Sequence, residues 1–148
     1  MGAFRRRPPD DVIPDQWTML RGQYEGRPLL VRVRSGARKL VGSPRHPIRI
    51  GVAIPFRAPT EEGMCSPEEL AQLEAFEDAL VSRAGGSAVL VAVITTSGTR
   101  EFVLYTGASE WVAQFHEDLR AALPSHRVDV IAETDPTWSV YLQLCPSS

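Results

Sequence analysis

The sequence predicts an α+β domain with a ferredoxin-like βαββαβ core, and three stretches carry that prediction. Residues 48–57 place an apolar side chain at every second position, which is typical of a half-buried strand. The segment 66–69 (SPEE) joins an N-cap serine, a proline at the first helical position and a capping-box glutamate, so we expect a helix to start there. Residues 87–106 form two β-rich arms around a short glycine-containing loop, which indicates a hairpin.

The N-terminal part is expected to hold a tail followed by another hairpin. Residues 1–14 contain three consecutive arginines and several prolines, so we expect a flexible basic and proline-rich tail. A single α+β domain is expected over residues 15–148. In it, residues 16–23 and 28–34 pair as an added N-terminal β-hairpin, whose second arm has one apolar face and one largely basic face.

The rest of the chain supplies the remaining core elements. The first helix is expected to end at Gly85-Gly86, because glycine commonly follows a helix. The later elements are expected as strands at 89–95 and 100–105, a helix capped by Ser109 and closed by Pro124, a strand at 127–133, and a C-terminal strand at 138–144. This order, from residue 48 onwards, is the ferredoxin-like pattern with one strand added at the end of the chain.

In that topology the strand at 89–95 lies at an edge of the sheet. It is also the most continuously apolar run of the sequence, and an uncovered apolar edge promotes aggregation. We therefore expect the edge to be covered. The N-terminal hairpin, the C-terminal strand and the same edge of a second subunit are the three candidates.

The composition is that of an ordinary globular protein, with an uneven distribution of charge. The net charge is −2, yet the first fifty residues hold eleven Lys and Arg against four Asp and Glu. This asymmetry indicates either a basic surface for nucleic acid or an acidic partner, or two parts that complement each other within one fold. No apolar signal-peptide core and no membrane-spanning run is present, so we expect a cytoplasmic protein.

No pattern in the sequence predicts a catalytic, metal or cofactor site. The histidines occur singly, without the spacing of a zinc helix, and no glycine-rich nucleotide-binding motif is present. Cys65 stands near a predicted helix start, but four glutamates surround it in sequence and oppose a thiolate. The sequence therefore favours a non-enzymatic protein without a cofactor or bound metal.

RNA binding is an alternative, because RNA-recognition domains share the predicted order of elements. Their third strand carries a basic octamer with stacking aromatic residues. Here only the second half of the corresponding octamer, residues 98–105, matches, and Glu101 brings a charge of the wrong sign. Packing in a core strand explains Phe102 and Tyr105 without RNA.

The segment 134–141 is the last candidate for function. Its Asp-Pro step initiates a turn, and Trp138 and Tyr141 place two amphipathic rings near the end of the chain. These rings can fill the core when the last element docks, with Asp135 fixing the turn. Alternatively, Tyr105, Asp135, Trp138 and Tyr141 form a small pocket.

These features resemble a bacterial family known as domain of unknown function 695. The shared elements are an early strand with Trp17, the GRPLLVRVR segment, Gly63-Met64 before the SPEE helix start, REFVLY at 100–105, and Asp135-Pro136-x-Trp138-x-x-Tyr141. The resemblance covers nearly the whole chain beyond the tail and carries no catalytic residues. Some members are joined to a domain similar to the regulator-of-ribonuclease-E inhibitor, which implies regulation through protein contact.

Together these observations favour a non-catalytic binding or regulatory module that acts through protein contact, with a homodimer as one form of it. The candidate functional residues are Trp17, Tyr105, Asp135, Trp138 and Tyr141. An RNA-binding module that uses the basic N-terminal segment, and an enzyme with a small pocket near the C-terminal segment, are the alternatives.

Overall fold

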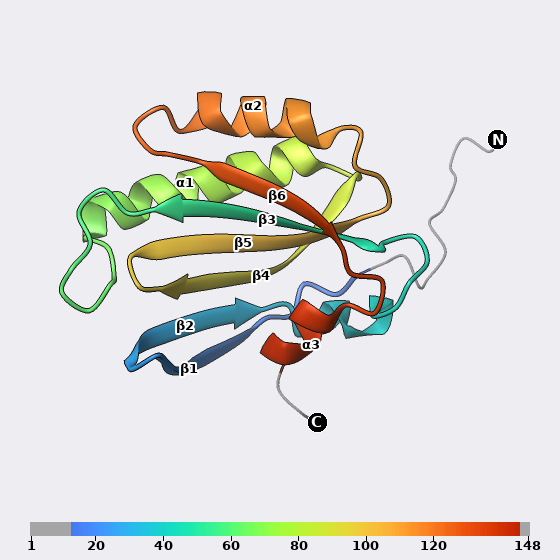
Figure 1. The fold of residues 1–148 in the computed structure, drawn as a ribbon, viewed down its shortest axis with the longest axis horizontal. Coiled ribbons are helices and arrows are strands. Elements are labelled where there is room, and N and C mark those ends of the chain that lie inside the picture. The colour runs from blue at the N-terminus through green and yellow to red at the C-terminus, as the bar shows by residue number, and fades with distance from the viewer. Residues whose placement is uncertain (1–12, 146–148) are drawn as a thin grey trace.

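The computed structural model describes residues 13–145, which form one antiparallel sheet with helices on both faces (Figure 1). The strands lie in the order β1-β2-β4-β5-β3-β6, and every neighbouring pair is antiparallel. The strands are β1 (Thr18–Tyr24), β2 (Arg27–Val33), β3 (Ile48–Pro55), β4 (Ala88–Thr96), β5 (Thr99–Thr106) and β6 (Asp129–Thr134). The helices are the 3-10 helix η2 (Ser35–Leu40), α1 (Pro67–Ala84), α2 (Val112–Ala122) and α3 (Ser139–Leu144).

Two apolar cores lie on opposite faces of this sheet. On one face α1 and α2 bury residues such as Phe76 and Phe115 against Phe102 and its neighbours. On the other face η2 and the C-terminal segment pack on β2, β4 and β5, with Trp138 fully buried. Figure 1 shows α1 and α2 together on one side of the sheet and α3 apart from them. The expected α+β organisation is therefore confirmed.

The start and the end of α1 follow from its local sequence, as expected. The Ser66 hydroxyl accepts a hydrogen bond from the backbone N–H of Glu69 at 3.2 Å, and Pro67 occupies the first helical position. Gly85 ends the helix with a φ of 53°, a left-handed value that a residue without a side chain adopts at no steric cost.

The N-terminal hairpin covers the apolar edge of β4. β1 and β2 pair through a tight turn in which Glu25 and Gly26 both have positive φ, and β2 then pairs along β4 with Val31 opposite Ile94. Of the three candidates for this edge, the hairpin is the one observed. The predicted tail lies outside the described residues except for Ile13 and Pro14, whose carbonyl oxygens accept hydrogen bonds from Arg34.

The predicted C-terminal strand is wrong, because residues 139–144 form the helix α3. Trp138 adopts a left-handed conformation with a φ of 60°, which turns the chain out of the extended direction. The Asp135 carboxylate then accepts hydrogen bonds from the backbone N–H groups of Ser139 and Val140, at 2.9 and 3.2 Å. These are N–H groups of the first helical turn, which need acceptors from outside the helix.

The expected cap of α2 is also corrected by the structure. Trp111 occupies the N-cap position, and no side chain caps the helix there. Ser109 contributes its backbone oxygen instead, which accepts from the Val112 N–H at 3.1 Å. At the other end Leu123, just after the helix, is buried in the core.

Over the described part of the chain, no helix combines the length and the apolarity that a bilayer crossing requires. Residues 13–145 also contain no group of three or more His, Cys, Asp or Glu side chains placed to hold a metal ion.

Candidate functional site

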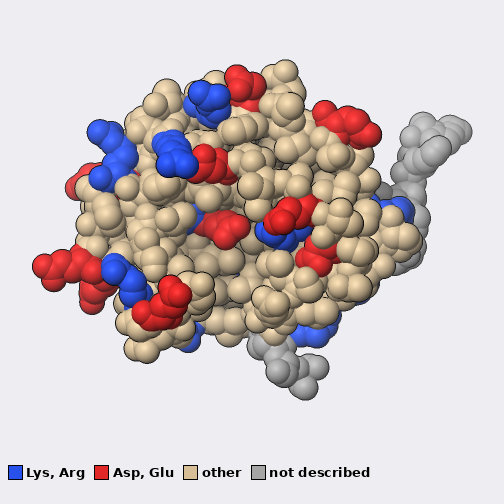
Figure 2. All heavy atoms as spheres, in the orientation of Figure 1, with Lys and Arg blue, Asp and Glu red and all other residues tan. Residues whose placement is uncertain are grey.

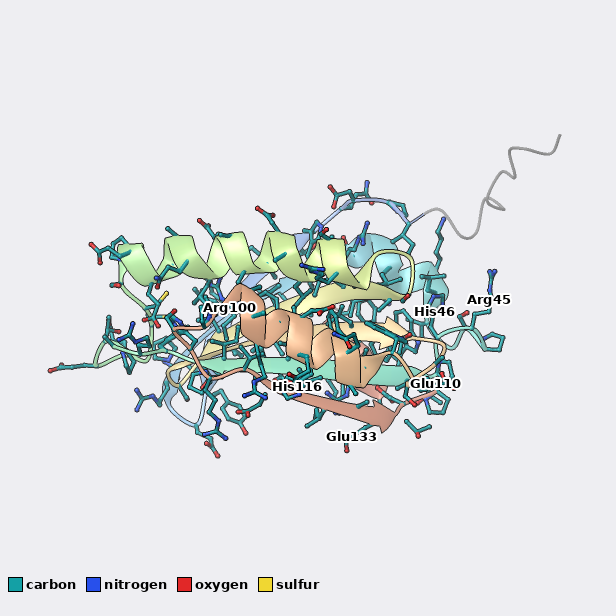
Figure 3. The ribbon with its side chains drawn as sticks, turned by 90° about the horizontal axis from the view of Figure 1, so that it is seen from above. Arg45, His46, Arg100, Glu110, His116 and Glu133 are labelled. Atoms are coloured by element: carbon teal, nitrogen blue, oxygen red, sulfur yellow. The ribbon has the colours of Figure 1, made fainter. Side chains whose placement is uncertain are left out.

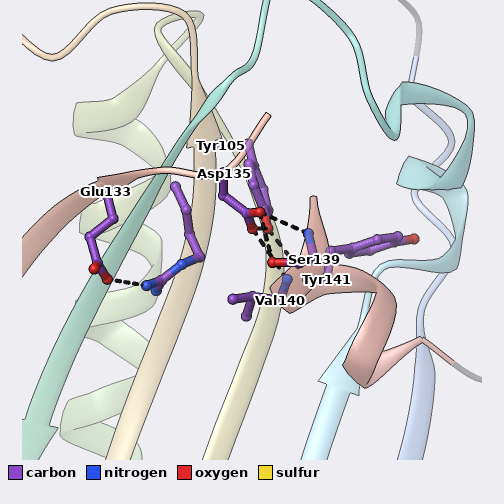
Figure 4. A network of polar contacts seen from close by, with 7 residues as sticks. Tyr105, Glu133, Asp135, Ser139, Val140 and Tyr141 are labelled. Carbon is purple, nitrogen blue, oxygen red and sulfur yellow. Dashed lines mark hydrogen bonds and ion pairs between the residues drawn. The ribbon is translucent and has the colours of Figure 1, made fainter. Parts of the chain in front are cut away.

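Four of the five candidate residues come together in one buried cluster, the C-terminal clamp: Tyr105, Asp135, Trp138 and Tyr141. The Tyr105 hydroxyl donates a hydrogen bond of 2.6 Å to Asp135 Oδ2 (Figure 4). Trp138 stacks on the Tyr105 ring with 4.0 Å between centroids. Tyr141 meets Trp138 edge to face at 5.5 Å. Three of these side chains are fully buried, and Asp135 is 7% exposed.

The polar atoms of the clamp are used within the protein. Besides the bonds at Asp135, the Trp138 indole donates to the His46 carbonyl oxygen at 2.8 Å, and the Tyr141 hydroxyl donates to the Arg34 carbonyl oxygen at 2.7 Å. The clamp thus ties α3 to β5, to the end of β2 and to the loop before β3. This arrangement supports the interpretation of these residues as core rather than as a pocket.

The pKa shifts of the clamp agree with a structural role. Burial alone would raise the pKa of Asp135, but hydrogen bonds from Tyr105, Ser139 and Val140 outweigh it and lower the pKa. Burial and the neighbouring Asp135 raise the pKa of Tyr105. The carboxylate is therefore held ionised as an acceptor, and the phenol is held protonated as its donor.

An Asp135→Asn variant tests this charge directly through its pH dependence. We expect it to lower the free energy of unfolding at neutral pH by about 1–3 kcal/mol, because an amide N–H₂ replaces one of the two acceptor oxygens. The folded pKa of Asp135 lies below the unfolded value of about 3.9. Its contribution is therefore fully present above that pH and is lost as the pH falls through the folded pKa.

Urea unfolding of both proteins at a series of pH values measures the difference. The gap between wild type and Asp135→Asn should shrink on acidification from about pH 6 to about pH 3. Asp78→Asn, at an exposed position on α1, serves as the control and should show no such gap. A gap for Asp135→Asn that stays constant or widens would contradict the account.

Trp17, the fifth candidate, lies apart from the clamp. Its indole N–H donates to Asp15 Oδ1 at 2.7 Å, and the guanidinium carbons of Arg32 and Arg34 lie 4.9 and 5.8 Å from its ring centroid. Arg32 lies on β2 and Arg34 directly follows the strand, and the alternation of residues 28–34 predicted that the two share one basic face. The ring and the two cations form one side of a large recess.

We call this recess the Trp17 groove; its volume is about 890 Å³. Its apolar wall is built from the C-terminal end of α1 and from β4 and β5, and includes Val81, Ala84, Leu90 and Leu104. Its polar side comprises Asp15, Arg32, Arg34, Arg45, His46 and Glu77. Figure 3 places Arg45 and His46 at the same end of the molecule as the C-terminal end of α1.

Arg32 and Arg34 differ in how their charges are balanced. Arg32 forms an ion pair of 2.5 Å with Glu77 of α1. Arg34 donates only to the backbone oxygens of Pro14 and Ile13, at 3.2 and 3.3 Å. Among residues 13–145 no carboxylate forms an ion pair with Arg34. Arg34 therefore brings an uncompensated positive charge to the groove.

A second buried cluster was not predicted from the sequence. The His126 side chain is fully buried, and its Nε2 lies 2.6 Å from Glu69 Oε2, which also accepts from the Arg57 N–H at 2.6 Å. Ser125 Oγ lies 2.8 Å from His126 Nδ1. The series of a serine, a histidine and a carboxylate resembles a catalytic relay, but neither the Trp17 groove nor the second, smaller cavity reaches it. We interpret this cluster as a structural link between the end of β3, the start of α1 and the α2–β6 turn.

Cys65 is partly buried against the core on the helix-covered face. Burial raises the pKa of its thiol, the nearby Arg100 guanidinium acts in the opposite direction, and Glu69 raises the pKa further. The thiol is therefore disfavoured as a nucleophile at neutral pH.

The sheet does not offer the stacking surface that an RNA-recognition domain uses. Phe102 faces the helices, and Tyr105 on the other face is covered by Trp138. On that other face an ion pair of 2.5 Å joins Arg49 to Glu133, and Glu101 lies close to the same arginine. Figure 2 shows acidic and basic side chains interspersed over the face in view, with neither sign gathered into a patch.

A comparison of the chain with known protein families found a match. The family of unknown function DUF695 matches residues 15–145, a range that runs from before β1 to the end of α3. The chain belongs to this family. The expected resemblance is thus confirmed. The C-terminal clamp lies within the part of this DUF695 domain that matches, as does the Trp17 groove apart from Ile13. No curated protein matches the chain.

Proposed function

We propose that this DUF695 protein is a non-catalytic binding module whose binding site is the Trp17 groove. One observation carries the proposal, namely a recess of about 890 Å³ with an apolar wall and a basic side. Sites for small molecules have volumes of about 300–1,000 Å³ and combine apolar walls with a few placed polar groups. The groove has both properties.

The polar side chains of the groove support binding over catalysis. The Glu77 carboxylate is paired with Arg32, and the Asp15 carboxylate accepts the indole N–H of Trp17. Each carboxylate therefore already holds a side chain of the groove in place, which favours a positioning role over that of a general base. The alternative enzyme pocket near the C-terminus has less support, because the clamp residues are buried and bonded to one another.

A small ligand has more support than a protein partner. The sequence favoured protein contact and a homodimer in part because a second subunit was one of three candidates to cover the edge of β4. In the structure β2 pairs with that edge, so this argument for a partner no longer applies. Standard protein interfaces bury roughly 800 Å² on each partner, and the groove is a compact recess rather than an extended surface.

The fold proposed for the part that supports the groove is a ferredoxin-like core with an added N-terminal hairpin. The order β6-β3-β5-β4 within the sheet, with α1 and α2 on one face, supports this assignment. On this reading the hairpin β1-β2 extends the sheet past the end of the helical layer. The groove then occupies the step between the helices and the extension.

A Gly86→Leu variant tests the location of the site. Gly86 lines the groove, and a Cβ atom added there meets no atom within 4 Å, so the larger side chain enters open space at the groove wall. We expect the variant to fold as the wild type does and to lose ligand binding. The measurement is a screen of small organic acids, bases and neutral compounds by amide chemical-shift perturbation.

The matched control is Gly22→Leu, because a Cβ atom at Gly22 also meets nothing within 4 Å and the residue lies on β1 outside the groove. Shifts that cluster on groove residues, persist in Gly22→Leu and vanish in Gly86→Leu are the expected result. A screen without binders, or with binders that ignore Gly86→Leu, would refute the proposed site.

A further inference from the structure

We infer that the ligand of the Trp17 groove is a small amphipathic anion, an organic carboxylate or phosphate with an apolar body, and that Arg34 binds its charged group. This inference rests on the proposed function and adds the chemical class of the ligand. The observation behind it is that Arg34 lines the groove and has no acidic partner among residues 13–145.

Arg34 has donors left for an anion. A guanidinium group carries five N–H donors in a fixed planar fork. The Nε donor is used by the Pro14 oxygen and one Nη2 donor by the Ile13 oxygen. The remaining donors at the end of the fork suffice for both oxygens of a carboxylate, or for two oxygens of a phosphate.

The position of Arg34 is fixed before a ligand arrives. Its two backbone acceptors hold the guanidinium at one edge, and the Trp17 ring lies 5.8 Å from the guanidinium carbon. A cation that is already oriented loses less conformational freedom on binding than a free surface arginine. The site is therefore preorganised for a charged group at this point.

Arg32 makes the groove selective for a single anionic group. It lies on the same face of β2 as Arg34, but its charge is balanced by Glu77 at 2.5 Å. A second anionic group beside Arg32 would meet the Glu77 carboxylate and be repelled by it. One charged end at Arg34 is thus favoured over two.

The apolar wall accounts for the other part of the ligand. Val81 of α1, 48% exposed, faces the groove together with Val89 and Leu90 from β4. Burying apolar surface against such a wall contributes about 25 cal/mol per Å². A free inorganic anion would leave this wall in contact with water, so the observations favour an acid that carries a hydrocarbon or aromatic body.

Calorimetric titration with three probes tests the inference: octanoate, octyl phosphate and octanol. On the wild-type protein both anions are expected to bind more tightly than octanol. In Arg34→Met, which keeps an apolar stem, the affinity for the anions should fall roughly 10- to 100-fold, since hydrogen bonds to charged groups are lost. Octanol binding should be unchanged, which also reports that the groove is intact.

Two further variants keep the result decisive. Arg34→Lys retains the charge but not the planar fork, so its affinity for the anions should lie between those of the wild type and Arg34→Met. Arg21→Met removes an arginine that does not line the groove and should change nothing. If octanol and octanoate bind equally well and Gly86→Leu abolishes the binding of both, the inference of an anionic ligand is overturned. The proposed location of the site is then retained. Binding of no probe, or binding that Gly86→Leu does not affect, would overturn both.

Discussion

Replacing Trp138 by alanine is expected to lower the free energy of unfolding by about 3–5 kcal/mol. The Trp138 side chain is fully buried, stacks on Tyr105 and donates its indole N–H to the His46 carbonyl oxygen. Its removal opens a large cavity between α3 and the sheet and leaves a buried carbonyl without its donor. Urea unfolding monitored by circular dichroism measures the change.

Leu142→Ala is the control for this prediction. Leu142 belongs to the same short helix but is 44% exposed, so its truncation should change stability by less than about 0.5 kcal/mol. If α3 only rested loosely on the sheet, the two variants would have similar stabilities. A cost below about 1 kcal/mol for Trp138→Ala would therefore contradict the description of the C-terminal clamp.

His126→Ala is expected to destabilise the protein by a similar amount, about 3–5 kcal/mol. His126 is fully buried and bonds the Glu69 carboxylate, whose Oε1 is already buried without a hydrogen-bond partner. Without the imidazole, the carboxylate keeps the Arg57 N–H but loses its partner from the α2–β6 turn. The end of β3, the start of α1 and that turn then lose their common connection.

The exposed pair of Arg120 and Glu117 provides the comparison. Both side chains are more than 60% exposed, and a surface pair of this kind contributes about 0–1 kcal/mol. Glu117→Gln should therefore unfold at nearly the same urea concentration as the wild type. Equal midpoints for His126→Ala and Glu117→Gln would show that the buried link does not stabilise the fold.

Local sequence chemistry predicted the elements whose signals are short range. The SPEE segment predicted the start of α1. Glycines that adopt a positive φ in the turns, such as Gly26 and Gly98, indicated both hairpins. The prediction of a C-terminal strand over residues 138–144 was wrong because a short, mostly apolar segment fits a strand or a helix equally well. The left-handed backbone of Trp138 and the hydrogen bonds of Asp135 direct this segment into a helix. The position of Asp135 depends in turn on Tyr105, thirty residues away.

The candidate site was only partly accessible from the sequence, for the same reason. The alternation of β2 predicted a basic face with Arg32 and Arg34, but not that the Trp17 ring would lie against it. The meeting of His126 and Glu69 spans fifty-seven residues and left no local signal. The sequence grouped Tyr105, Asp135, Trp138 and Tyr141 as candidates, and in the structure these residues lie together in one buried cluster.

The most direct test of the central claim is a crystal structure of the protein grown with octanoate. The account predicts the hydrocarbon chain in the Trp17 groove, along Val81 and Leu90, with the carboxylate within hydrogen-bond distance of Arg34. An empty groove, or octanoate bound elsewhere on the molecule, would contradict it.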